Sequence, residues 1–431
     1  MSSSRKEFDH LQSQIHNSGS NAASRCDIPA IVFGTSITAL GVLRTLSRRG
    51  IQTLVYTNPN DLVTQSKYYK PLIVPAEFQS PGASTDRFIS IVRSLSFERA
   101  VLFPCTDTWT EAAAAIPEYL KKRFLTSLAP PETISILLDK GKLASVMSQL
   151  GLPHPMTVVS DDPGLLHEMD EKRFHGAFLK PRSSARFIEQ YKVKALHVST
   201  KAEAILKFNE LQKAGFHVLL QEYIPGPPTE HYFIDGFIDR TGAVRAQFAR
   251  QRLRMYPADF GNSTYMKSIA MDLVEPAMNN LKILFAYLNY RGIFSAEFKR
   301  DPRNGNFCLL EVNVRPWWYV EFAEYCGAPV CEMAYADALG IELPKMNDYK
   351  TNVGCAYPYF DLEGYFWYQR ERKHGNLAAL AAKRVSLASC VASWVRSKQP
   401  IFAWNDTGPV ISNFRFLVKR FLKNHLMPRT K

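Results

Sequence analysis

The chain has 431 residues, of which 46% are hydrophobic and 22% charged, and it carries a formal net charge of +13 and seven cysteines. This composition is ordinary for a soluble enzyme, and the length allows two or three domains with their own cores. No apolar run reaches the twenty or so residues of a membrane span and the N-terminus lacks an apolar signal segment, so we expect a cytoplasmic protein. The odd number of cysteines, without a CxxC pair, argues against a disulfide framework and a zinc site.

The positive charge is concentrated at the C-terminus. Between Arg372 and Lys431, twelve Lys and Arg residues stand against one acid, Asp406, so +11 of the net charge of +13 lies in the last sixty residues. The chain has no recognised nucleic-acid motif, and we expect no nucleic-acid partner. A basic amphipathic helix over 413–426 is predicted to dock onto the protein body, and contact with a membrane surface is the less favoured alternative.

Residues 1–27 are rich in Ser, Asn and Gln and are predicted to form a disordered leader. From residue 28 to residue 130, short apolar runs alternate with helical patterns, which predicts an α/β domain that opens with a βαβ unit. Asp107 follows a predicted strand at the edge where open α/β sheets bind ligands, so it either orients a substrate or caps a helix. The predicted strands are 30–33, 52–56, 72–74, 100–103 and 123–126.

The region from 131 to 340 carries two candidate phosphate-binding lysines. Lys140 directly precedes a predicted helix that ends at Leu150, and Lys180 stands near the end of a short apolar strand, 177–181. A sheet can hold such a lysine while its ammonium reaches a phosphate, although the alternative for both is a solvated charge. Ser183 lies in the segment 182–186, whose hydroxyl and guanidinium groups suit phosphate binding.

A strand over 218–224 is interrupted by Pro225 and Gly226. Such a break suits a hinge whose extended backbone meets the edge of an adenine ring, and the alternative is an ordinary strand and turn. Further along, three arginines alternate on one predicted strand face: Arg250, Arg252 and Arg254. Like charges on one face repel unless an anion lies across them, so the cluster predicts a carboxylate-binding face or, alternatively, a solvated edge strand.

The stretch from Phe294 to Arg315 is predicted to be a β-hairpin, because two alternating segments flank a turn that contains Asn304-Gly305. The pairing brings Glu297 to the neighbourhood of Glu311, and the second strand carries Leu309, Glu311, Asn313 and Arg315 on one face. Two carboxylates and an amide oxygen are hard donors that suit Mg²⁺, whereas the alternative is a polar face that only meets water. Beyond the hairpin we predict a helix over 321–339, aromatic strands near 355–360 and a helix over 377–395.

The order of these motifs resembles that of the ATP-grasp ligases, in particular the branch related to the carbamoyl-phosphate synthase large subunit and D-aspartate ligase. The resemblance covers residues 28–340 and rests on Lys140, Lys180, the segment at Glu222, Glu297 and the pattern Glu311-x-Asn313-x-Arg315. It implies an α/β and α+β fold. Its parts would be a Rossmann-like preATP-grasp domain (28–130) and a two-lobed ATP-grasp domain (131–340). Residues 341–431 lie beyond the resemblance, and we expect them to form a basic, helical C-terminal extension.

The resemblance also implies roles for individual residues. Lys140, Lys180 and Ser183 would contact the phosphates of ATP, Glu222, Tyr223 and Ile224 would lie at the adenine, and Glu230 would contact the ribose. Glu297, Glu311 and Asn313 would bind Mg²⁺, for which Mn²⁺ would substitute. Arg252 would help to hold a substrate carboxylate, and Arg315 with Arg254 would steady the transferring phosphoryl group.

The reaction that the resemblance implies is the ATP-dependent joining of a small-molecule carboxylate to an amine through an acyl phosphate, with release of ADP and phosphate. The alternative is a nucleotide-binding regulatory or scaffold protein without turnover, which the lack of glycines after Lys180 supports. A second alternative is a protein that acts on nucleic acid or a membrane through its basic tail. The acid, the amine and the oligomeric state stay open at this point.

Overall fold

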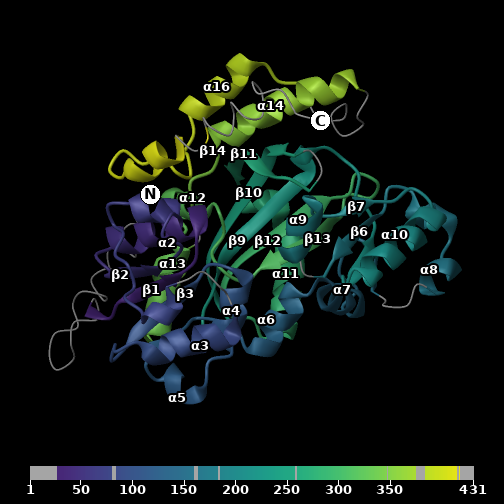
Figure 1. The fold of residues 1–431 in the computed structure, drawn as a ribbon. Coiled ribbons are helices and arrows are strands. Elements are labelled where there is room, and N and C mark those ends of the chain that lie inside the picture. The colour runs from purple at the N-terminus through teal and green to yellow at the C-terminus, as the bar shows by residue number, and fades with distance from the viewer. Residues whose placement is uncertain are drawn as a thin grey trace.

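The computed structural model describes residues 27–79, 84–159, 164–182, 185–257, 260–346, 348–374, 384–414 and 417. Three sheets frame this part of the chain (Figure 1). Ser183, nearly all of the predicted leader and most of the predicted basic helix 413–426 lie outside the described residues. Within the described ranges, no helix is long and apolar enough to cross a lipid bilayer.

The first sheet is parallel, and both of its faces are covered by helices. Its elements are β1 (Ala30–Phe33), α2 (Ser36–Arg48), β2 (Thr53–Tyr56), α3 (Thr85–Ser94), β3 (Ala100–Pro104), α4 (Asp107–Ala114), α5 (Glu118–Lys121) and β4 (Phe124–Leu125), with the strand order β2-β1-β3-β4. The side chains of β1 alternate between a core shared with α2 and a core shared with α3 and α4. A parallel sheet buried on both faces explains why β1 reads as an uninterrupted apolar run.

Four of the five strands predicted in this region are confirmed, and the strand predicted at 72–74 is wrong. The chain makes only an isolated parallel bridge at this point, between Pro71 and Val55. Pro71 and Pro75 lack the N–H that a ladder needs, and Ile73 is 81% exposed. The segment therefore does not extend the sheet.

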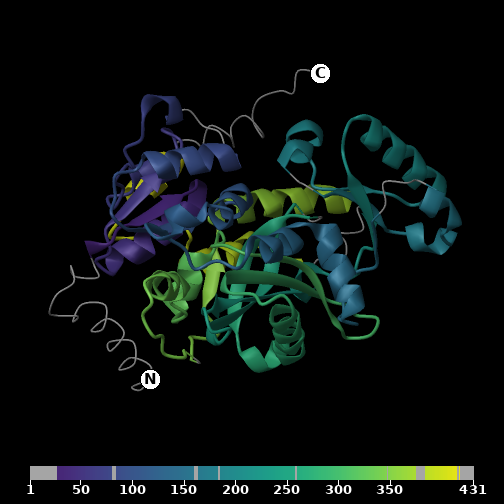
Figure 2. The ribbon, with the colours of Figure 1, turned by 90° about the horizontal axis from the view of Figure 1, so that it is seen from below.

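The second sheet is antiparallel and belongs to a lobe that projects from one side of the molecule (Figure 2). Two helices, α6 (Pro131–Leu138) and α7 (Lys140–Gln149), lead into it. Its elements are β5 (Thr157–Val159), α8 (Gly164–Glu168), β6 (Phe178–Pro181), α9 (Ala185–Tyr191), β7 (Leu196–His197), α10 (Lys201–Lys213) and β8 (Val218–Gln221). The strand order is β5-β8-β6-β7, and the core of this small lobe contains Phe174, Leu179 and Phe208.

The third sheet is the largest, and we call it the large sheet. Its strands are β9 (His231–Ile238), β10 (Val244–Tyr256), β11 (Asn262–Ile269), β12 (Gly292–Arg300), β13 (Phe307–Asn313) and β14 (Gly354–Ala356), in the order β13-β12-β9-β10-β11-β14. One face packs on α6, α7 and α11 (Glu275–Tyr287). The other face packs at one end on α12 (Val320–Cys326), α13 (Val330–Ala338) and α2, and so joins the large sheet to the first sheet through a shared core.

The single helix predicted over 321–339 is wrong, because the structure divides it into α12 and α13. Gly327 follows α12 with a φ of 111°, a left-handed conformation that favours glycine. It caps the C-terminal end of the helix. Pro329 precedes α13 and cannot continue a helical hydrogen-bond ladder. Gly327 and Pro329 therefore cause the turn between the two helices, and a prediction from the helical pattern alone does not take them into account.

The C-terminal region begins with β14, which pairs with β11 as the edge of the large sheet. The aromatic strands predicted near 355–360 are confirmed only for β14, since α14 (Pro358–Lys373) starts directly after it with a proline in its first turn. Of the helix predicted over 377–395, the described part contains α16 (Leu387–Val395). Both helices lie across the top of the large sheet in Figure 1.

A buried arginine ties the C-terminal region to the first sheet. Arg44 on α2 is fully buried, and its Nε lies 2.8 Å from Asp406 Oδ2 while its Nη1 lies 3.3 Å from Glu321 Oε2. Ser66 Oγ also donates to Asp406 Oδ2, over 2.7 Å. The described residues after β14 are therefore an integral part of the fold and not an appended tail.

Candidate active site

A cleft of about 820 Å³ lies between the small lobe and the large sheet. It gathers residues from β6 and β8 on one side and from β9, β10, β12 and β13 on the other. Most of the residues singled out from the sequence as ligand-binding or catalytic line it: Asp107, Lys140, Lys180, Glu222, Tyr223, Ile224, Arg252, Glu297, Glu311, Asn313 and Arg315. Glu230 and Arg254 are not among the lining residues, and Ser183 lies outside the described part of the chain.

The predicted hairpin is confirmed, and its register places the two acids opposite each other. Glu297 on β12 pairs with Glu311 on β13, and Ser295 pairs with Asn313. A register shift follows Glu297, so that Phe298 pairs with Leu309. This bulge turns Leu309 into the core while Leu310 and Glu311 both line the cleft, and the prediction that Leu309 shares a face with Glu311 is therefore wrong.

The donor set on this hairpin consists of two carboxylates and one amide oxygen. Mg²⁺ that also binds nucleotide phosphates usually takes only one or two protein carboxylates, and so these residues suit it. Among the described residues, no hydrogen bond or ion pair engages the Glu311 carboxylate. In the same part of the chain, no group of three or more His, Cys, Asp or Glu side chains is arranged to hold a metal ion.

Glu297 is held by two neighbours. Its Oε1 lies 3.0 Å from Arg252 Nη2 and 2.8 Å from His231 Nδ1. Burial alone would raise the pKa of the Glu297 carboxyl, but Arg252 and His231 together hold that pKa well below its ordinary value. Burial, aided by the charge of Arg252, lowers the pKa of His231 to about 4, so this imidazole is neutral at pH 7.

The two predicted phosphate lysines approach the cleft from different elements. Lys180 stands on β6, where its neighbour Leu179 points into the core of the small lobe and Lys180 itself lines the cleft. Desolvation by the cleft walls lowers the pKa of Lys180 to about 8, although the nearby Glu311 carboxylate acts to raise it. Lys140 is the first residue of α7, and Asp139 caps that helix by accepting hydrogen bonds from the N–H groups of Gly141 and Lys142.

The predicted hinge runs along the cleft. The backbone N–H of Glu222 donates to Met156 O over 2.9 Å, and the Glu222 carboxylate lies 2.6 Å from Arg303 Nη2. The ammonium nitrogen of Lys299 lies over the ring of Tyr223, 4.3 Å from the ring centroid. Gly226 has a φ of 110°, which turns the chain out of β8 toward β9.

Glu230 does not reach the cleft. A short 3₁₀ helix, η5 (Pro228–Glu230), turns its side chain toward the end of β12, where Arg300 Nε lies 2.8 Å from its Oε2. The structure therefore gives no support to the predicted ribose contact.

The three alternating arginines are not an open anion-binding face, because each already has a carboxylate partner. Arg250 pairs with buried Asp235 at 2.7 Å, Arg252 pairs with Glu297, and Arg254 makes a two-pronged contact with Asp361 on α14 at 2.9 and 2.7 Å. Register shifts on both sides of Arg254 break the alternation and turn its side chain away from the cleft. Arg254 is therefore not placed to contact a transferring phosphoryl group, contrary to the prediction.

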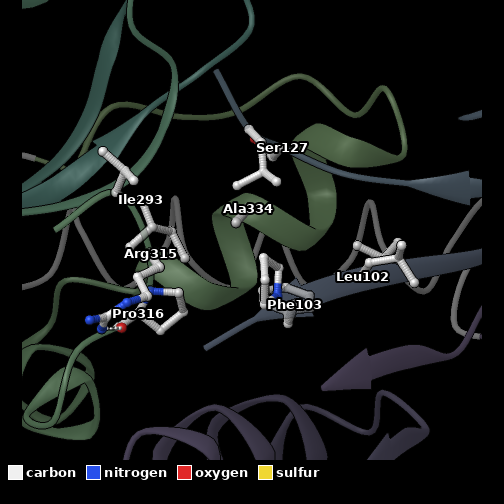
Figure 3. Close-up of a pocket in the computed structure, with 11 residues that line it drawn as sticks. Leu102, Phe103, Ser127, Ile293, Arg315, Pro316 and Ala334 are labelled. Carbon is white, nitrogen blue, oxygen red and sulfur yellow. Dashed lines mark hydrogen bonds between the residues drawn. The ribbon is translucent and has the colours of Figure 1, made fainter. Parts of the chain in front are cut away.

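Arg315 stands where β13 leads back to the first sheet (Figure 3). Its Nη1 donates to the carbonyl of Pro316 over 3.1 Å, and its Nε lies 2.6 Å from Asp107 Oδ1. Asp107 opens α4, but the cap of that helix is Thr106, whose hydroxyl accepts from Trp109 N. The cavity beside Arg315 in Figure 3 has a volume of only about 20 Å³, too small for a substrate.

Sequence reasoning missed several residues that line the cleft. Lys194 donates to Asn262 Oδ1 over 3.1 Å, and the ring of Phe260 lies 4.7 Å from Phe178 and 5.2 Å from His197. These side chains stand on loops and strand ends, where no periodic pattern marks them. The alternation of the first hairpin strand predicts that Lys299 shares the face of Glu297, but no role is predicted for it.

No protein-family model matches the chain. The chain is 23% identical over 301 residues to D-aspartate ligase of Enterococcus faecium (strain Aus0004), a match that covers 66% of this chain and 70% of the relative. The biotin carboxylase domain of 2-oxoglutarate carboxylase from Hydrogenobacter thermophilus, solved with MgADP and bicarbonate, has a TM-score of 0.58 at 17% identity and covers 75% of this chain and 73% of its own. L-Amino acid ligase from Bacillus licheniformis has a TM-score of 0.53 at 13% identity, with coverage of 72% and 74%.

The structural similarities show that the chain has the ATP-grasp fold. The sequence similarity to D-aspartate ligase agrees with the resemblance to the ATP-grasp ligases that the order of motifs indicates. The resemblance inferred from the order of motifs is thereby confirmed.

Proposed function

We propose that this protein joins a small-molecule carboxylate to an amine, using MgATP to form an acyl phosphate that the amine then attacks. The observation that carries the proposal is the Glu297–Glu311 pair on the hairpin, which lines one cleft together with Lys140 and Lys180 of the opposite side. Oxygen donors for a divalent cation thus share a cleft with ammonium groups for phosphates. We further infer that the first sheet is the preATP-grasp domain and that the small lobe and the large sheet are the two lobes of the ATP-grasp domain.

In this proposal the nucleotide lies on the small-lobe side of the cleft. The backbone of 222–224 meets the adenine edge, and the apolar side chain of Ile224 packs on the ring. Lys140 and Lys180 hold the phosphates by charge-assisted hydrogen bonds. The binding of an anion favours the charged form of Lys180 and so offsets the desolvation that lowers its pKa in the ligand-free cleft.

Glu311, Asn313 and Glu297 hold Mg²⁺ in the proposal. Bound there, the ion neutralises charge on the phosphate oxygens. The Glu311 carboxylate makes no hydrogen bond or ion pair with a described residue, although the ammonium groups of Lys180 and Lys194 lie near enough to attract it. Glu297 is kept ionised and oriented by Arg252 and His231, as is usual for carboxylates that serve as metal ligands.

The remaining charged residues position the reacting groups. Arg315 steadies the transferring phosphoryl group, and Arg252 keeps the Glu297 carboxylate in place. The amine nitrogen attacks the acyl carbon, the bond from that carbon to the phosphoryl oxygen breaks, and phosphate leaves with its electron pair while the nitrogen loses a proton. No covalent bond to the protein is needed, and the rate gain comes from positioning and charge neutralisation.

The experiment that tests the proposal is a matrix of ADP-release assays. Purified protein is incubated with Mg²⁺, ATP, one pool of carboxylic acids including amino acids and one pool of amines, and each pool is also omitted. ADP formation that requires both pools is the expected result, and product mass identifies the two substrates. Binding of MgATP without ADP formation in any combination would instead support the regulatory alternative, and failure to bind MgATP would contradict both.

A further inference from the structure

The C-terminal region contributes a side chain to the cleft. Tyr368 lines it together with residues of the small lobe and the large sheet, and it is the only lining residue from the described part of the chain after Arg315. It stands on α14, a helix that lies beyond the ATP-grasp motifs of the sequence and has no role in the reaction proposed above. If α14 is held in one position, its side chain can limit which substrates fit the cleft.

Three partners fix α14 on the large sheet through one buried carboxylate. Asp361 accepts a two-pronged contact from Arg254, a hydrogen bond from Thr264 Oγ1 over 2.7 Å and one from Trp394 Nε1 over 2.7 Å. The residue is 2% exposed. A carboxylate so fully satisfied holds the helix in a single position on β10 and β11 and links it to α16.

The same face of α14 leads from this anchor to the cleft. Asp361 contacts Arg254, and one turn later Gly364 packs so closely on β10 that an added Cβ would lie 3.2 Å from the Cβ of Tyr256. Residues 361, 364 and 368 share one helix face, so Tyr368 follows in the same direction, past the end of β10. Beyond β10 the cleft is also lined by Phe260, Gly261 and Asn262, the last being the first residue of β11.

We propose that Tyr368 is a specificity-determining residue, and that its phenol forms part of the wall against which the carboxylate or amine substrate binds. This inference rests on the ligase function proposed above. The groups proposed to bind nucleotide are Lys140, Lys180 and the 222–224 segment, which stand on or beside the small lobe. Tyr368 instead continues the side of the cleft formed by β10 and β11, which carries Arg252, Met255 and Asn262.

The chemistry of this wall indicates the class of substrate. Arg252 is already paired with Glu297 and the hydroxyl of Tyr368 is buried, so this wall presents mainly the apolar surface of Met255 and of the Tyr368 ring. A small substrate that carries an apolar side group fits such a wall. α14 therefore limits the size of that side group.

The test compares Tyr368→Ala and Tyr368→Phe with Phe366→Ala in the full-length protein. Phe366 is an aromatic residue of the same helix, 39% exposed and absent from the cleft wall, so its variant controls for general damage to α14. KM is measured for ATP and, separately, for the acid and the amine identified by the pooled assay. Circular dichroism and the thermal midpoint verify that each variant is folded.

For Tyr368→Ala we expect KM for one of the two small substrates to rise about tenfold or more, with KM for ATP within about twofold of wild type. We also expect the ranking of acids or amines to shift toward larger side groups, with Tyr368→Phe intermediate and Phe366→Ala unchanged. If the wild type is active and a folded Tyr368→Ala leaves both small-substrate KM values and the ranking unchanged, or raises KM for ATP alone, the assignment of Tyr368 is wrong. If the wild type forms no ADP with any pair, the ligase proposal fails and the inference about Tyr368 fails with it.

Discussion

Arg315 of the large sheet and Asp107 of the first sheet face each other at the cleft, with Nε 2.6 Å from Oδ1. The two residues lie more than two hundred positions apart in the chain; Arg315 follows the end of β13, and Asp107 is the first residue of α4, the helix that follows β3. Because the Asp107 side chain is 54% exposed, the pair contributes little to stability. Its consequence is that the orientation of Arg315 depends on a residue outside the two lobes that form the rest of the cleft.

Replacement of Asp107 by Asn should therefore affect turnover more than stability. Arg315 keeps its hydrogen bond to Pro316 but loses the ion pair that aims its Nε, because Asn carries no charge, and we expect kcat to fall about tenfold. Steady-state kinetics and the thermal midpoint measure the two effects. Asp86→Asn is the matched control, since Asp86 is likewise an acid in the first turn of a helix of the first sheet. A loss of thermal stability in Asp107→Asn without a change in kcat would contradict this assignment.

The binding of ATP should weaken at alkaline pH because of Lys180. Desolvation lowers its pKa to about 8 in the ligand-free protein, so its positive charge is present below that pH and is lost above it. Bound phosphate stabilises the charged form, and the dissociation constant for MgATP should thus be constant below about pH 7.5 and rise up to about tenfold per pH unit above pH 8. Isothermal titration calorimetry across pH 6.5–9.5 measures it.

Two variants of Lys180 separate charge from other effects of pH. Lys180→Arg keeps a positive charge throughout this range, and its dissociation constant should not follow the alkaline rise. Lys180→Met should bind MgATP about ten- to a hundredfold more weakly at pH 7, the cost of one charge-assisted hydrogen bond to phosphate. An alkaline rise that persists in Lys180→Arg would assign the titration to another group.

The C-terminal region should be needed for the stability of the first sheet because of Arg44. Asp406→Asn removes one of the two carboxylates around this fully buried guanidinium, and we expect a loss of about 3 kcal/mol in the free energy of unfolding. Glu118→Gln, which removes one partner of an exposed pair with Lys121, should cost less than about 0.5 kcal/mol. Thermal and urea unfolding of both variants measure the difference.

The contribution of Asp406 should also depend on pH. Burial acts to raise its pKa, but hydrogen bonds from Ser66 and Arg44 lower it below the ordinary value. The folded state therefore binds the proton less readily than the unfolded state, so this contribution is complete above about pH 5 and is lost as the pH falls toward the folded pKa. Equal acid sensitivity in wild type and Asp406→Asn would contradict the pairing.

The parts of the site that could be predicted from the sequence are those set by local pattern. Glu297 and Glu311 lie opposite each other because two alternating segments and an Asn-Gly turn fix a hairpin without help from the rest of the chain. The helix after Asp139 is likewise predicted from the local sequence, and the structure adds that it starts at Lys140 with Asp139 as its cap. Neither inference needs any knowledge of how the sheets pack.

What the sequence could not supply is the identity of partners that are distant along the chain. The pattern of arginines predicts that Arg254 meets an anionic substrate, but Asp361, more than a hundred residues later, takes that place. The bulge beside Glu311 also leaves no mark in the pattern of apolar residues, and it reverses the side on which Leu309 lies. Tyr368 escapes prediction for the first of these reasons, since only packing brings α14 to the cleft.

The central claim is that the Glu297–Glu311 hairpin holds the divalent cation of an ATP-dependent ligase. The most direct test titrates Mg²⁺ in the ADP-release assay for wild type, Glu311→Gln and Glu230→Gln, the last being a control carboxylate on an adjacent element outside the cleft wall. We predict that Glu311→Gln lowers the rate at least about a hundredfold and raises the Mg²⁺ requirement, while Glu230→Gln behaves as wild type. A Glu311→Gln protein that forms ADP at the wild-type rate and the wild-type Mg²⁺ concentration would contradict the claim.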